Sequence, residues 1–390
     1  MTDQPGEAAR FLTRNAVEAL PEGALERQLA RRQPLRVKLG VDPTTPDIHL
    51  GHTVVLRKLR EFQELGHAVV LIIGDYTARV GDPSGRSSER PHADPEQVDR
   101  NAATYQEQAF KVLDRGRTEV RRNGEWLDMP TEELFRLART STVAQLLERD
   151  DFARRYAARE PISVLELLYP LLQGYDSVAV RSDVELGGTD QKFNVLLARQ
   201  VQQAYGVEPQ SILTLPILPG IDGALKMSKS LGNYVGVTDP PEEMFGKLMR
   251  VPDEAMPIYY RLLLDEPFDP SRPPLEAKRA MARALCARYH GEDAAATAEA
   301  QFDRLHVERG APDHVEEFAF QAVDGEVHLP ALLSDAFGIS RSEGRRLLSQ
   351  EGVRLDGRPL DGGTLDVPAA KLDGGLIQLG RRRFKRLRLA

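Results

Sequence analysis

Residues 37–73 read VKLGVDPTTPDIHLGHTVVLRKLREFQELGHAVVLII, and this stretch predicts a strand, a helix and a second strand in succession. Residues 37–41 indicate a short buried strand, and a loop rich in proline and threonine follows. From Gly51 the apolar side chains recur at helical spacing, and we expect the helix to end at Gly66. Residues 68–73 are again apolar without interruption. A strand, a helix and a strand in this order form the unit of a parallel sheet with a right-handed crossover.

The strand–helix pattern is interrupted and then returns further along the chain. Residues 91–161 are polar and mostly helical in pattern, so we expect them to form an insertion between two halves of the sheet domain. Beyond the insertion we expect a strand at 178–186, a helix at 192–205, a strand at 212–218 and helices from 240 to 305. The expected fold class is therefore α/β, with a parallel-sheet domain and a following α-helical domain.

Residues 327–390 have a pattern of their own. Two short helices are expected at 329–337 and 341–351, followed by short strands between Gly-rich turns. This segment holds 12 Lys/Arg against 7 Asp/Glu, although the whole chain has a net charge of −7. A basic end on an acidic chain is typical of an appendage that binds a polyanion. Charge alone would also fit an ordinary solvated surface.

Length and composition limit the class of protein. A chain of 390 residues, at roughly 100–200 residues per domain, is expected to hold two or three domains. Cys286 is the only cysteine, so neither an internal disulfide nor a cysteine-based metal site can form. The sequence has no apolar run long enough for a membrane span, and its first residues lack the pattern of a secretion signal. We expect a cytoplasmic protein without a membrane partner.

The first chemical signal is His49-Leu50-Gly51-His52, at the expected start of the first helix. A helix start presents free N–H groups and a positive dipole end, so it attracts phosphate. Gly51 lets a base or a phosphate approach the backbone closely, and the two histidines can donate hydrogen bonds to a triphosphate. A helix start with two polar capping residues is the alternative interpretation of the same residues.

The second signal is Lys226-Met227-Ser228-Lys229-Ser230, on a loop after the expected strand 212–218. Two ammonium groups three residues apart can hold a polyphosphate and neutralise the charge of a departing pyrophosphate. Taken alone, a loop rich in lysine and serine is more often ordinary surface.

Together, and in this order, the two signals resemble the paired signatures of the class I aminoacyl-tRNA synthetases. The resemblance implies a Rossmann-like fold that binds ATP between the signatures. Further segments resemble the tyrosine-specific members of this family along nearly the whole chain. These segments are Gly40–Thr44, Gly81–Arg86, the helix that carries Tyr169, Gln173, Tyr175 and Asp176, and Gly187–Gln191.

The resemblance implies a function and assigns site residues. It implies a tyrosine–tRNA ligase that uses ATP with Mg²⁺, charges tRNA(Tyr) and forms a homodimer. The implied catalytic residues are His49, His52, Lys226 and Lys229. The implied ATP-binding residues are these four with Thr44, Gly51, Gly188, Asp190, Met227, Ser228 and Ser230. The implied tyrosine-binding residues are Asp42, Asp82, Tyr169, Gln173, Asp176 and Gln191. Asp82, Tyr169 and Gln173 would accept the ammonium, Asp176 the phenol hydrogen, and Gln191 would face the carboxylate.

Lys38 departs from the pattern of many bacterial members, which have a tyrosine at this position that contacts the substrate phenol. Lys38 would either pair with an acid elsewhere or help to hold the phenol oxygen. The departure resembles a second bacterial subgroup of the same family, so the expected amino acid remains tyrosine.

Residues 327–390 resemble the small RNA-binding fold first named for ribosomal protein S-four. The resemblance rests on the basic helix Arg341–Leu348 and on the following strand and turn, Gly352–Gly357. The residues expected to contact RNA are Arg341, Arg345, Arg346, Arg381, Arg382, Arg383 and Lys385. The expected boundaries are a catalytic domain at 1–235, a helical anticodon-side domain at 236–310, a linker at 311–326 and the small α+β RNA-binding domain at 327–390.

Three other functions fit part of these features. A tryptophanyl-tRNA synthetase shares the fold and the signatures, but Asp176 and the basic tail favour tyrosine. A small-molecule adenylyltransferase shares the histidine signature, but such enzymes are usually shorter and lack the tail. A catalytically silent RNA-binding paralogue is disfavoured because His49, His52 and Lys229 are intact.

Overall fold

The structure, a computed structural model, describes residues 5–43, 46–83, 95–306, 315–380 and 383–390. The chain divides into two compact units, Met1–Gly291 and Glu292–Ala390, and each is described by itself. Thr44, Arg381 and Arg382, together with the last three residues of the Gly81–Arg86 motif, lie outside the described residues.

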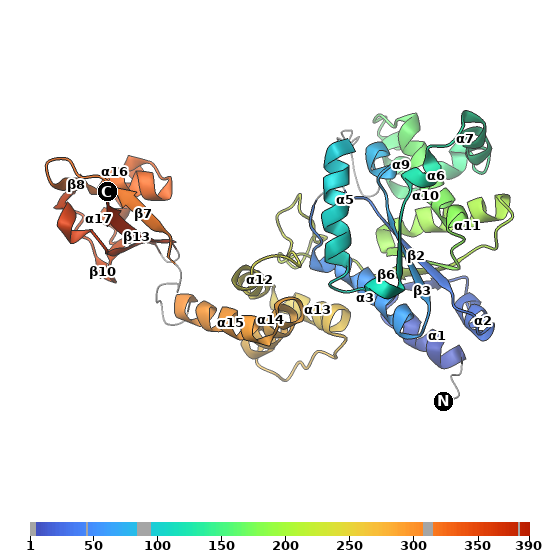
Figure 1. The fold of residues 1–390 in the computed structure, drawn as a ribbon, viewed down its shortest axis with the longest axis horizontal. Coiled ribbons are helices and arrows are strands. Elements are labelled where there is room, and N and C mark those ends of the chain that lie inside the picture. Colours follow the sequence, from blue (N-terminus) through green and yellow to red (C-terminus); the bar gives the residue numbers. More distant parts are fainter. Residues whose placement is uncertain (1–4, 44–45, 84–94, 307–314, 381–382) are drawn as a thin grey trace. The chain divides into compact units, whose positions relative to one another are not determined.

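A six-stranded sheet forms the centre of the first unit (Figure 1). Its strands are β1 (Glu18–Leu20), β2 (Arg36–Val41), β3 (Ala68–Ile73), β4 (Thr118–Arg122), β5 (Val184–Gly188) and β6 (Ser211–Leu215). The spatial order is β1-β6-β5-β2-β3-β4. Strands β2 to β6 run parallel, and β1 pairs antiparallel with β6 at one edge. The winding direction reverses between β2 and β5, and such a switch point opens a crevice at the carboxyl ends of the strands.

Helices cover both faces of this sheet, with α3 and α5 on one side and α10 and α11 on the other (Figure 1). The helices of the first unit are α1 (Pro5–Thr13), α2 (Ala24–Ala30), α3 (Leu50–Glu64), α4 (Thr77–Val80), α5 (Pro95–Ala109), α6 (Gly124–Leu127), α7 (Thr131–Ala138), α8 (Val143–Leu146), α9 (Asp150–Ala157), α10 (Val164–Ala179), α11 (Lys192–Ala204), α12 (Pro241–Leu248), α13 (Met256–Tyr259) and α14 (Pro274–His290). Because both faces are covered, β3 is buried along nearly its whole length, as its uninterrupted apolar run predicts.

Helix α10 carries the expected tyrosine-binding side chains, and its start is fixed by a reciprocal cap. Ser163 Oγ accepts a hydrogen bond from the backbone N–H of Glu166 at 3.2 Å. Glu166 Oε2 accepts from the backbone N–H of Ser163 at 2.9 Å. This capping box satisfies two N–H groups that a helix start otherwise leaves without a partner.

The second unit contains a five-stranded sheet with order β10-β9-β12-β13-β7 and a separate pair of strands, β8 and β11. Its elements are α15 (Glu292–His306), β7 (Glu317–Phe320), β8 (Glu326–His328), α16 (Leu329–Phe337), α17 (Arg341–Ser349), β9 (Val353–Leu355), β10 (Arg358–Pro359), β11 (Asp366–Pro368), β12 (Leu376–Leu379) and β13 (Arg383–Leu389). The buried side chains of Leu333, Leu348, Ile377 and Leu387 belong to one core that joins the helices to the sheet.

The expected α/β fold is confirmed, and three local expectations need correction. The insertion 91–161 contains β4, an edge strand of the main sheet. Its charged sequence is typical of edge strands and lacks the apolar pattern from which strands were predicted. Residues 178–186 are not one strand, because α10 continues to Ala179 and β5 begins at Val184. The expected linker 311–326 contains β7, which pairs in parallel with β13 and is thus part of the second unit's sheet.

Gly174 lies where α10 packs against α11, and we predict that Gly174→Ala lowers the free energy of unfolding. A Cβ atom there would lie 2.9 Å from Val201 Cγ2 and 3.3 Å from the Ala198 Cα. Overpacking of this kind typically costs about 1–3 kcal/mol. Chemical unfolding followed by circular dichroism measures the change.

The matched control is Gly246→Ala in α12, where no atom lies within 4 Å of the added Cβ. This substitution should raise the free energy of unfolding by up to about 1 kcal/mol, because alanine favours helix more than glycine does. Equal effects of the two substitutions would contradict tight packing at Gly174.

Candidate active site

A pocket of about 380 Å³ opens at the carboxyl ends of β2 and β5. Residues from both sequence signatures line it, together with every described residue that the resemblance assigns to tyrosine apart from Lys38. The lining residues expected from the sequence are Asp42, His49, Gly51, His52, Asp82, Tyr169, Gln173, Asp176, Gly188, Asp190, Gln191, Lys226, Met227, Ser228, Lys229 and Ser230. The pocket lies at the switch point of the sheet, where ligands of open α/β folds bind.

The histidine signature caps the start of α3. His49 is the N-cap residue, and its Nδ1 accepts from the backbone N–H of Gly51 at 3.2 Å. His52 Nδ1 accepts from the backbone N–H of His49 at 3.2 Å, and the two rings lie in contact with their centroids 3.8 Å apart and their planes tilted by 33°. Since each Nδ1 is an acceptor, the proton of each neutral ring sits on Nε2, which is then a donor. A Cβ at Gly51 would lie only 3.0 Å from the His49 ring, so a side chain here would press on that ring.

The two histidines stay neutral because of their surroundings. Burial, with added contributions from the charges of Lys229 and Lys226, lowers the pKa of His52 to about 3. Burial, His52 and the same two lysines hold the pKa of His49 far below its usual range. The pair therefore offers hydrogen bonds rather than fixed positive charge at neutral pH.

Backbone contacts bring the lysine loop to the histidine signature. The N–H of Leu50 donates to the carbonyl of Val235 at 2.9 Å, and the N–H of Val237 donates to the carbonyl of Ile48 at 2.9 Å. A Cβ on Gly51 would lie 3.6 Å from Met227 Cβ. The two signatures, far apart in sequence, are thus neighbours at one end of the pocket.

Both lysines of the loop contact acidic residues in this structure. Lys226 Nζ pairs with Asp190 Oδ2, beside the start of α11. Lys229 Nζ donates to the Asp47 carbonyl oxygen and lies 3.9 Å from Asp47 Oδ2. Burial lowers the pKa of Lys229, whereas Asp47 raises it. Asp47 was not singled out from the sequence, since nothing in its local pattern shows that the loop returns to it.

Asp42 receives two hydrogen bonds at the end of β2. Tyr169 Oη donates to Asp42 Oδ2 at 2.9 Å, and Thr77 Oγ1 donates to Asp42 Oδ1 at 2.7 Å. Burial, together with Asp42 and Asp82, holds the pKa of the Tyr169 hydroxyl well above its usual value. Tyr169 is therefore a neutral donor, and its ring forms part of the pocket wall.

Asp82, Gln191 and Gln173 belong to one chain of hydrogen bonds. Gln191 Nε2 donates to Asp82 Oδ2 at 3.0 Å, and Asn194 Nδ2 lies 3.0 Å from both Gln191 Oε1 and Gln173 Oε1. Arg149 donates to Asn194 Oδ1 at 3.0 Å and lies 3.8 Å from Asp82. The sequence did not point to Arg149 or Asn194, because each acts through a contact between distant segments.

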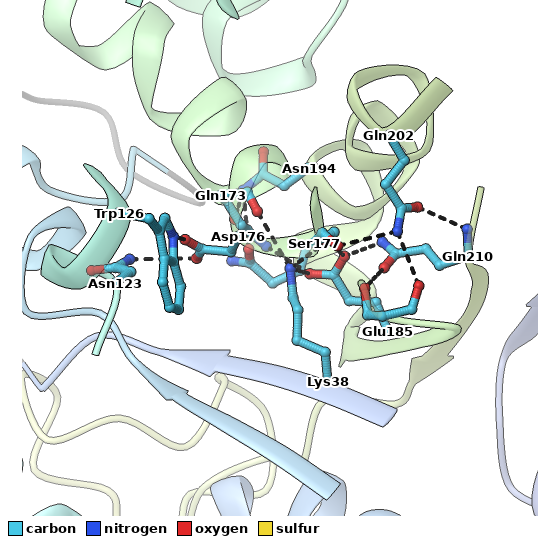
Figure 2. A network of polar contacts seen from close by, with 12 residues as sticks. Lys38, Asn123, Trp126, Gln173, Asp176, Ser177, Glu185, Asn194, Gln202 and Gln210 are labelled. Carbon is cyan, nitrogen blue, oxygen red and sulfur yellow. Dashed lines mark hydrogen bonds and ion pairs between the residues drawn. The ribbon is translucent and has the colours of Figure 1, made fainter. Parts of the chain in front are cut away.

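Asp176 is buried, with only 3% of its surface exposed, and its carboxylate accepts two hydrogen bonds (Figure 2). Trp126 Nε1 donates at 2.8 Å, and Asn123 Nδ2 donates at 3.4 Å. Burial raises the pKa of Asp176 to about 7, while Lys38, Trp126 and Asn123 lower it and Glu185 raises it. Trp126 is the chain's single tryptophan, which is the one sequence signal that could have drawn attention to it.

Lys38 is not among the pocket-lining residues and pairs with an acid, the first of the two alternatives considered for it. Its Nζ lies 2.9 Å from Glu185 Oε1, and both side chains are fully buried. The same ammonium donates to Ser177 Oγ at 2.6 Å and to the Gln173 carbonyl at 3.3 Å (Figure 2). Direct contact of Lys38 with a phenol oxygen has no support here.

The described residues of the second unit that were predicted to contact RNA lie on α17 and β13. Arg341, Arg345 and Arg346 are exposed on α17. Arg383 contacts Phe337 through its guanidinium, and Lys385 pairs with Glu316. Within the described part of this unit, the arginines of α17 are thus more accessible to a polyanion than Arg383 and Lys385.

Comparison with known proteins agrees with this geometry. The family described as tRNA synthetases class I (W and Y) matches residues 30–307. A tyrosine–tRNA ligase of Thermotoga maritima is 49% identical, with 98% of each chain covered. One of Oleidesulfovibrio alaskensis is also 49% identical, covering 97% of this chain and 98% of the relative.

Solved structures show the same fold over most of the chain. A tyrosyl-tRNA synthetase from Archaeoglobus fulgidus, complexed with L-tyrosine, superposes with a TM-score of 0.64 and 25% identity, covering 75% of this chain and 99% of that one. The C-terminally truncated mitochondrial enzyme of Aspergillus nidulans has a TM-score of 0.63 and 23% identity, covering 78% of this chain and 94% of that one. From the joint evidence of site, fold and sequence, the chain belongs to the class I tRNA synthetases, within their tyrosine–tRNA ligase family.

Proposed function

We propose that this protein is a tyrosine–tRNA ligase that first activates L-tyrosine with ATP and then transfers it to the 3′-terminal adenosine of tRNA(Tyr). Full-length relatives that are nearly half identical carry the name tyrosine–tRNA ligase. The observation that carries the proposal is that the histidine signature, the lysine loop and Asp176 all line one pocket.

The triphosphate binds at the end formed by the two signatures. His49 and His52 donate from Nε2, Lys226 and Lys229 supply positive charge, and the positive end of the α3 dipole lies at the same place. Gly51 and Gly188 leave room for the nucleotide, and Asp190 takes the ribose. The ion pairs of the two lysines with Asp190 and Asp47 place both ammonium groups at the pocket before ATP arrives.

Tyrosine binds at the Asp176 end. Asp82, Tyr169 and Gln173 surround the substrate ammonium, Gln191 faces its carboxylate, and Asp42 fixes Tyr169 through the 2.9 Å hydrogen bond. Asp176 accepts the hydrogen of the substrate phenol. A buried acceptor discriminates against phenylalanine, which would leave it without that partner; tyrosyl-tRNA synthetase is the reference case for this effect.

Activation is a substitution at phosphorus without a protein nucleophile. A tyrosine carboxylate oxygen attacks the α-phosphorus of ATP, the bond to the β-phosphate oxygen breaks, and pyrophosphate leaves with its electron pair. The terminal ribose hydroxyl of tRNA then attacks the carbonyl carbon of the adenylate, losing its proton as AMP leaves. The protein contributes positioning and stabilisation of the charge that moves onto the phosphates.

Mg²⁺ accompanies ATP in this proposal. Within the described ranges, no group of three or more His, Cys, Asp or Glu side chains could hold a metal ion. The donors that suit this ion are therefore phosphate oxygens and water, which Mg²⁺ commonly keeps when it is bound with a nucleotide.

The second unit binds tRNA through its basic residues. Arg341, Arg345, Arg346, Arg383 and Lys385 contact phosphates, as do Arg381 and Arg382 outside the described residues. Contacts of this kind position RNA without reading its sequence. The proposed domains are those expected from the sequence, with the strand β7 added to the last one.

The enzyme works in the cytoplasm as a homodimer. Homodimer formation is proposed from membership of the family, because the described residues do not show which surface the subunits share. No described helix is long and apolar enough to span a membrane.

The proposed function predicts that tyrosine alone among the amino acids supports rapid ATP–pyrophosphate exchange. Purified protein is incubated with ATP, labelled pyrophosphate and each amino acid in turn, and labelled ATP is counted. If tryptophan supported exchange and tyrosine did not, the protein would be a tryptophanyl-tRNA synthetase. Exchange with no amino acid would remove the proposed activity.

Substitution of His52→Ala or Lys229→Ala should slow adenylate formation by about 10²–10³-fold, as loss of a charge-stabilising donor typically does. Tyrosine affinity should change little, because these side chains lie at the triphosphate end. Single-turnover kinetics and equilibrium binding separate the two quantities. Equal losses in rate and affinity would count against the assigned roles.

The double substitution Arg345→Ala with Arg346→Ala should weaken tRNA binding and reduce its salt dependence. Removing two phosphate contacts lowers the slope of log affinity against log salt by roughly one to two. Arg115→Ala, an exposed arginine of the first unit paired with Glu107, is the control and should leave the slope unchanged. An unaltered slope in the double variant would exclude α17 as a tRNA contact.

A further inference from the structure

Behind the tyrosine end of the pocket lies a buried polar network to which the proposed function assigns no role (Figure 2). Lys38 on β2 and Glu185 on β5 are register partners in the parallel strand pair at the switch point. Their side chains have 0% and 1% exposure, and their charged atoms lie 2.9 Å apart. Removing the two charges of a deeply buried ion pair from water costs free energy. A pair of hydrophobic side chains in the same place would therefore stabilise the fold at least as well.

The contacts of Lys38 leave its ammonium no donor for a substrate. It contacts Glu185 Oε1, Ser177 Oγ and the Gln173 carbonyl, and these three acceptors match its three N–H donors. Ser177 directly follows Asp176 in α10, and Gln173 precedes it by three residues. Lys38 therefore holds the turn of α10 that presents Asp176.

Both carboxylate oxygens of Glu185 have partners, since Oε1 lies beside the Lys38 ammonium. Its Oε2 accepts from Ser177 Oγ at 3.2 Å and from Gln210 Nε2. Gln210 is fixed in turn, since its backbone N–H donates to Gln202 Oε1 at 2.8 Å and its Oε1 accepts from Ser182 Oγ at 2.5 Å. Glu185 also lines the pocket, so its charge acts on whatever binds there.

The pocket end thus contains two buried carboxylates, Asp176 and Glu185, and one ammonium. When two carboxyl groups lie close together in a buried site, the negative charge of one disfavours ionisation of the other, unless a cation lies between them. Lys38 on β2 and Glu185 on β5 face Asp176 from the sheet, and Trp126 and Asn123 face it from the segment at α6. Tyr169, on α10 itself, faces Asp42 and Asp82 as well as Asp176.

We propose that Lys38, acting through its ion pair with Glu185, is a positioning residue that keeps Asp176 ionised and thereby sets the selectivity of the pocket for a hydroxylated ring. An ionised carboxylate accepts the phenol hydrogen in a charge-assisted hydrogen bond, which is stronger than a neutral one. The inference rests on the proposed tyrosine-binding role of Asp176.

Two substitutions of nearly unchanged shape make opposite predictions. Lys38→Met removes the cation and leaves Glu185 beside Asp176, whereas Glu185→Gln removes the competing carboxylate and keeps the cation. The sign follows from the electrostatics: Lys38 lowers the pKa of Asp176 and Glu185 raises it. Tyrosine affinity is lost as the pH falls through the pKa of Asp176, which is about 7 in the unchanged protein.

The experiment is calorimetric titration of the full chain with tyrosine, and separately with phenylalanine. The titrations are repeated from about pH 5.5 to 8.5, a range in which the pKa of a buried carboxylate can lie. In Lys38→Met the pH midpoint of tyrosine affinity should rise by about one to three units. At pH 7, a rise of one pKa unit lowers the ionised fraction of Asp176 from about one half to about one eleventh, so tyrosine affinity should fall about fivefold or more, while phenylalanine affinity should not fall. In Glu185→Gln the midpoint should move to lower pH, and the double variant should lie between the two.

Glu61→Gln is the matched control. It removes the partner of another buried lysine, Lys58, on the side of α3 away from the pocket lining. It should lower the unfolding temperature without moving the pH midpoint. If Lys38→Met fails to fold, Glu185→Gln still tests the proposal through the direction of its shift.

The outcomes separate this inference from the proposed function. The role of Lys38 would be overturned if the pH midpoint of tyrosine affinity were the same in all variants. It would also be overturned if the midpoint moved in the same direction in Lys38→Met and Glu185→Gln. Neither result would contradict tyrosine binding itself. An unchanged protein that binds no tyrosine would instead overturn the proposed function.

Discussion

The parallel pairing of β2 with β5 is the constraint on which the rest of the structure depends. Val37 pairs with Val184 and Lys38 with Glu185, and the chain changes its direction of winding between these strands. The connections after them therefore leave toward opposite faces of the sheet and open a crevice at the strand ends. The start of α3, with its histidines, and the start of α11, with Gln191 at its cap, lie at this crevice.

The two ends of the pocket have different electrostatic characters, each produced by burial. At the end formed by the two signatures, burial and two nearby lysines keep the histidines neutral, so positive charge is left to the lysines. At the other end, burial disfavours an ionised Asp176, and a cation behind the pocket opposes that effect. One fold can therefore hold a polyanion and a phenol within a single cavity, because the charges are set locally by side chains from different elements.

Much of the fold could be predicted from the sequence where periodicity was strong. The apolar run at 68–73 is β3, and the helical spacing after Gly51 is α3, which begins one residue earlier. The expected helix at 329–337 is α16. The prediction failed for β4 and β7, whose charged or short sequences become strands only through pairing with a neighbour. It also misplaced the end of α10, because Val178 to Val180 suit a strand as well as a buried helix.

By itself the sequence determined the two signatures, the order of the main elements and the residue types that phosphate and phenol chemistry require, since these depend on local spacing and side-chain chemistry. Only the tertiary structure decided which groups meet: Trp126 and Asn123 with Asp176, Arg149 with Asp82, Asp47 with Lys229, and Lys38 with Glu185 rather than with the pocket. The physical reason is that these contacts join segments far apart in the chain. Their protonation states depend on burial and on charges from several elements at once, and no local pattern in the sequence records either quantity.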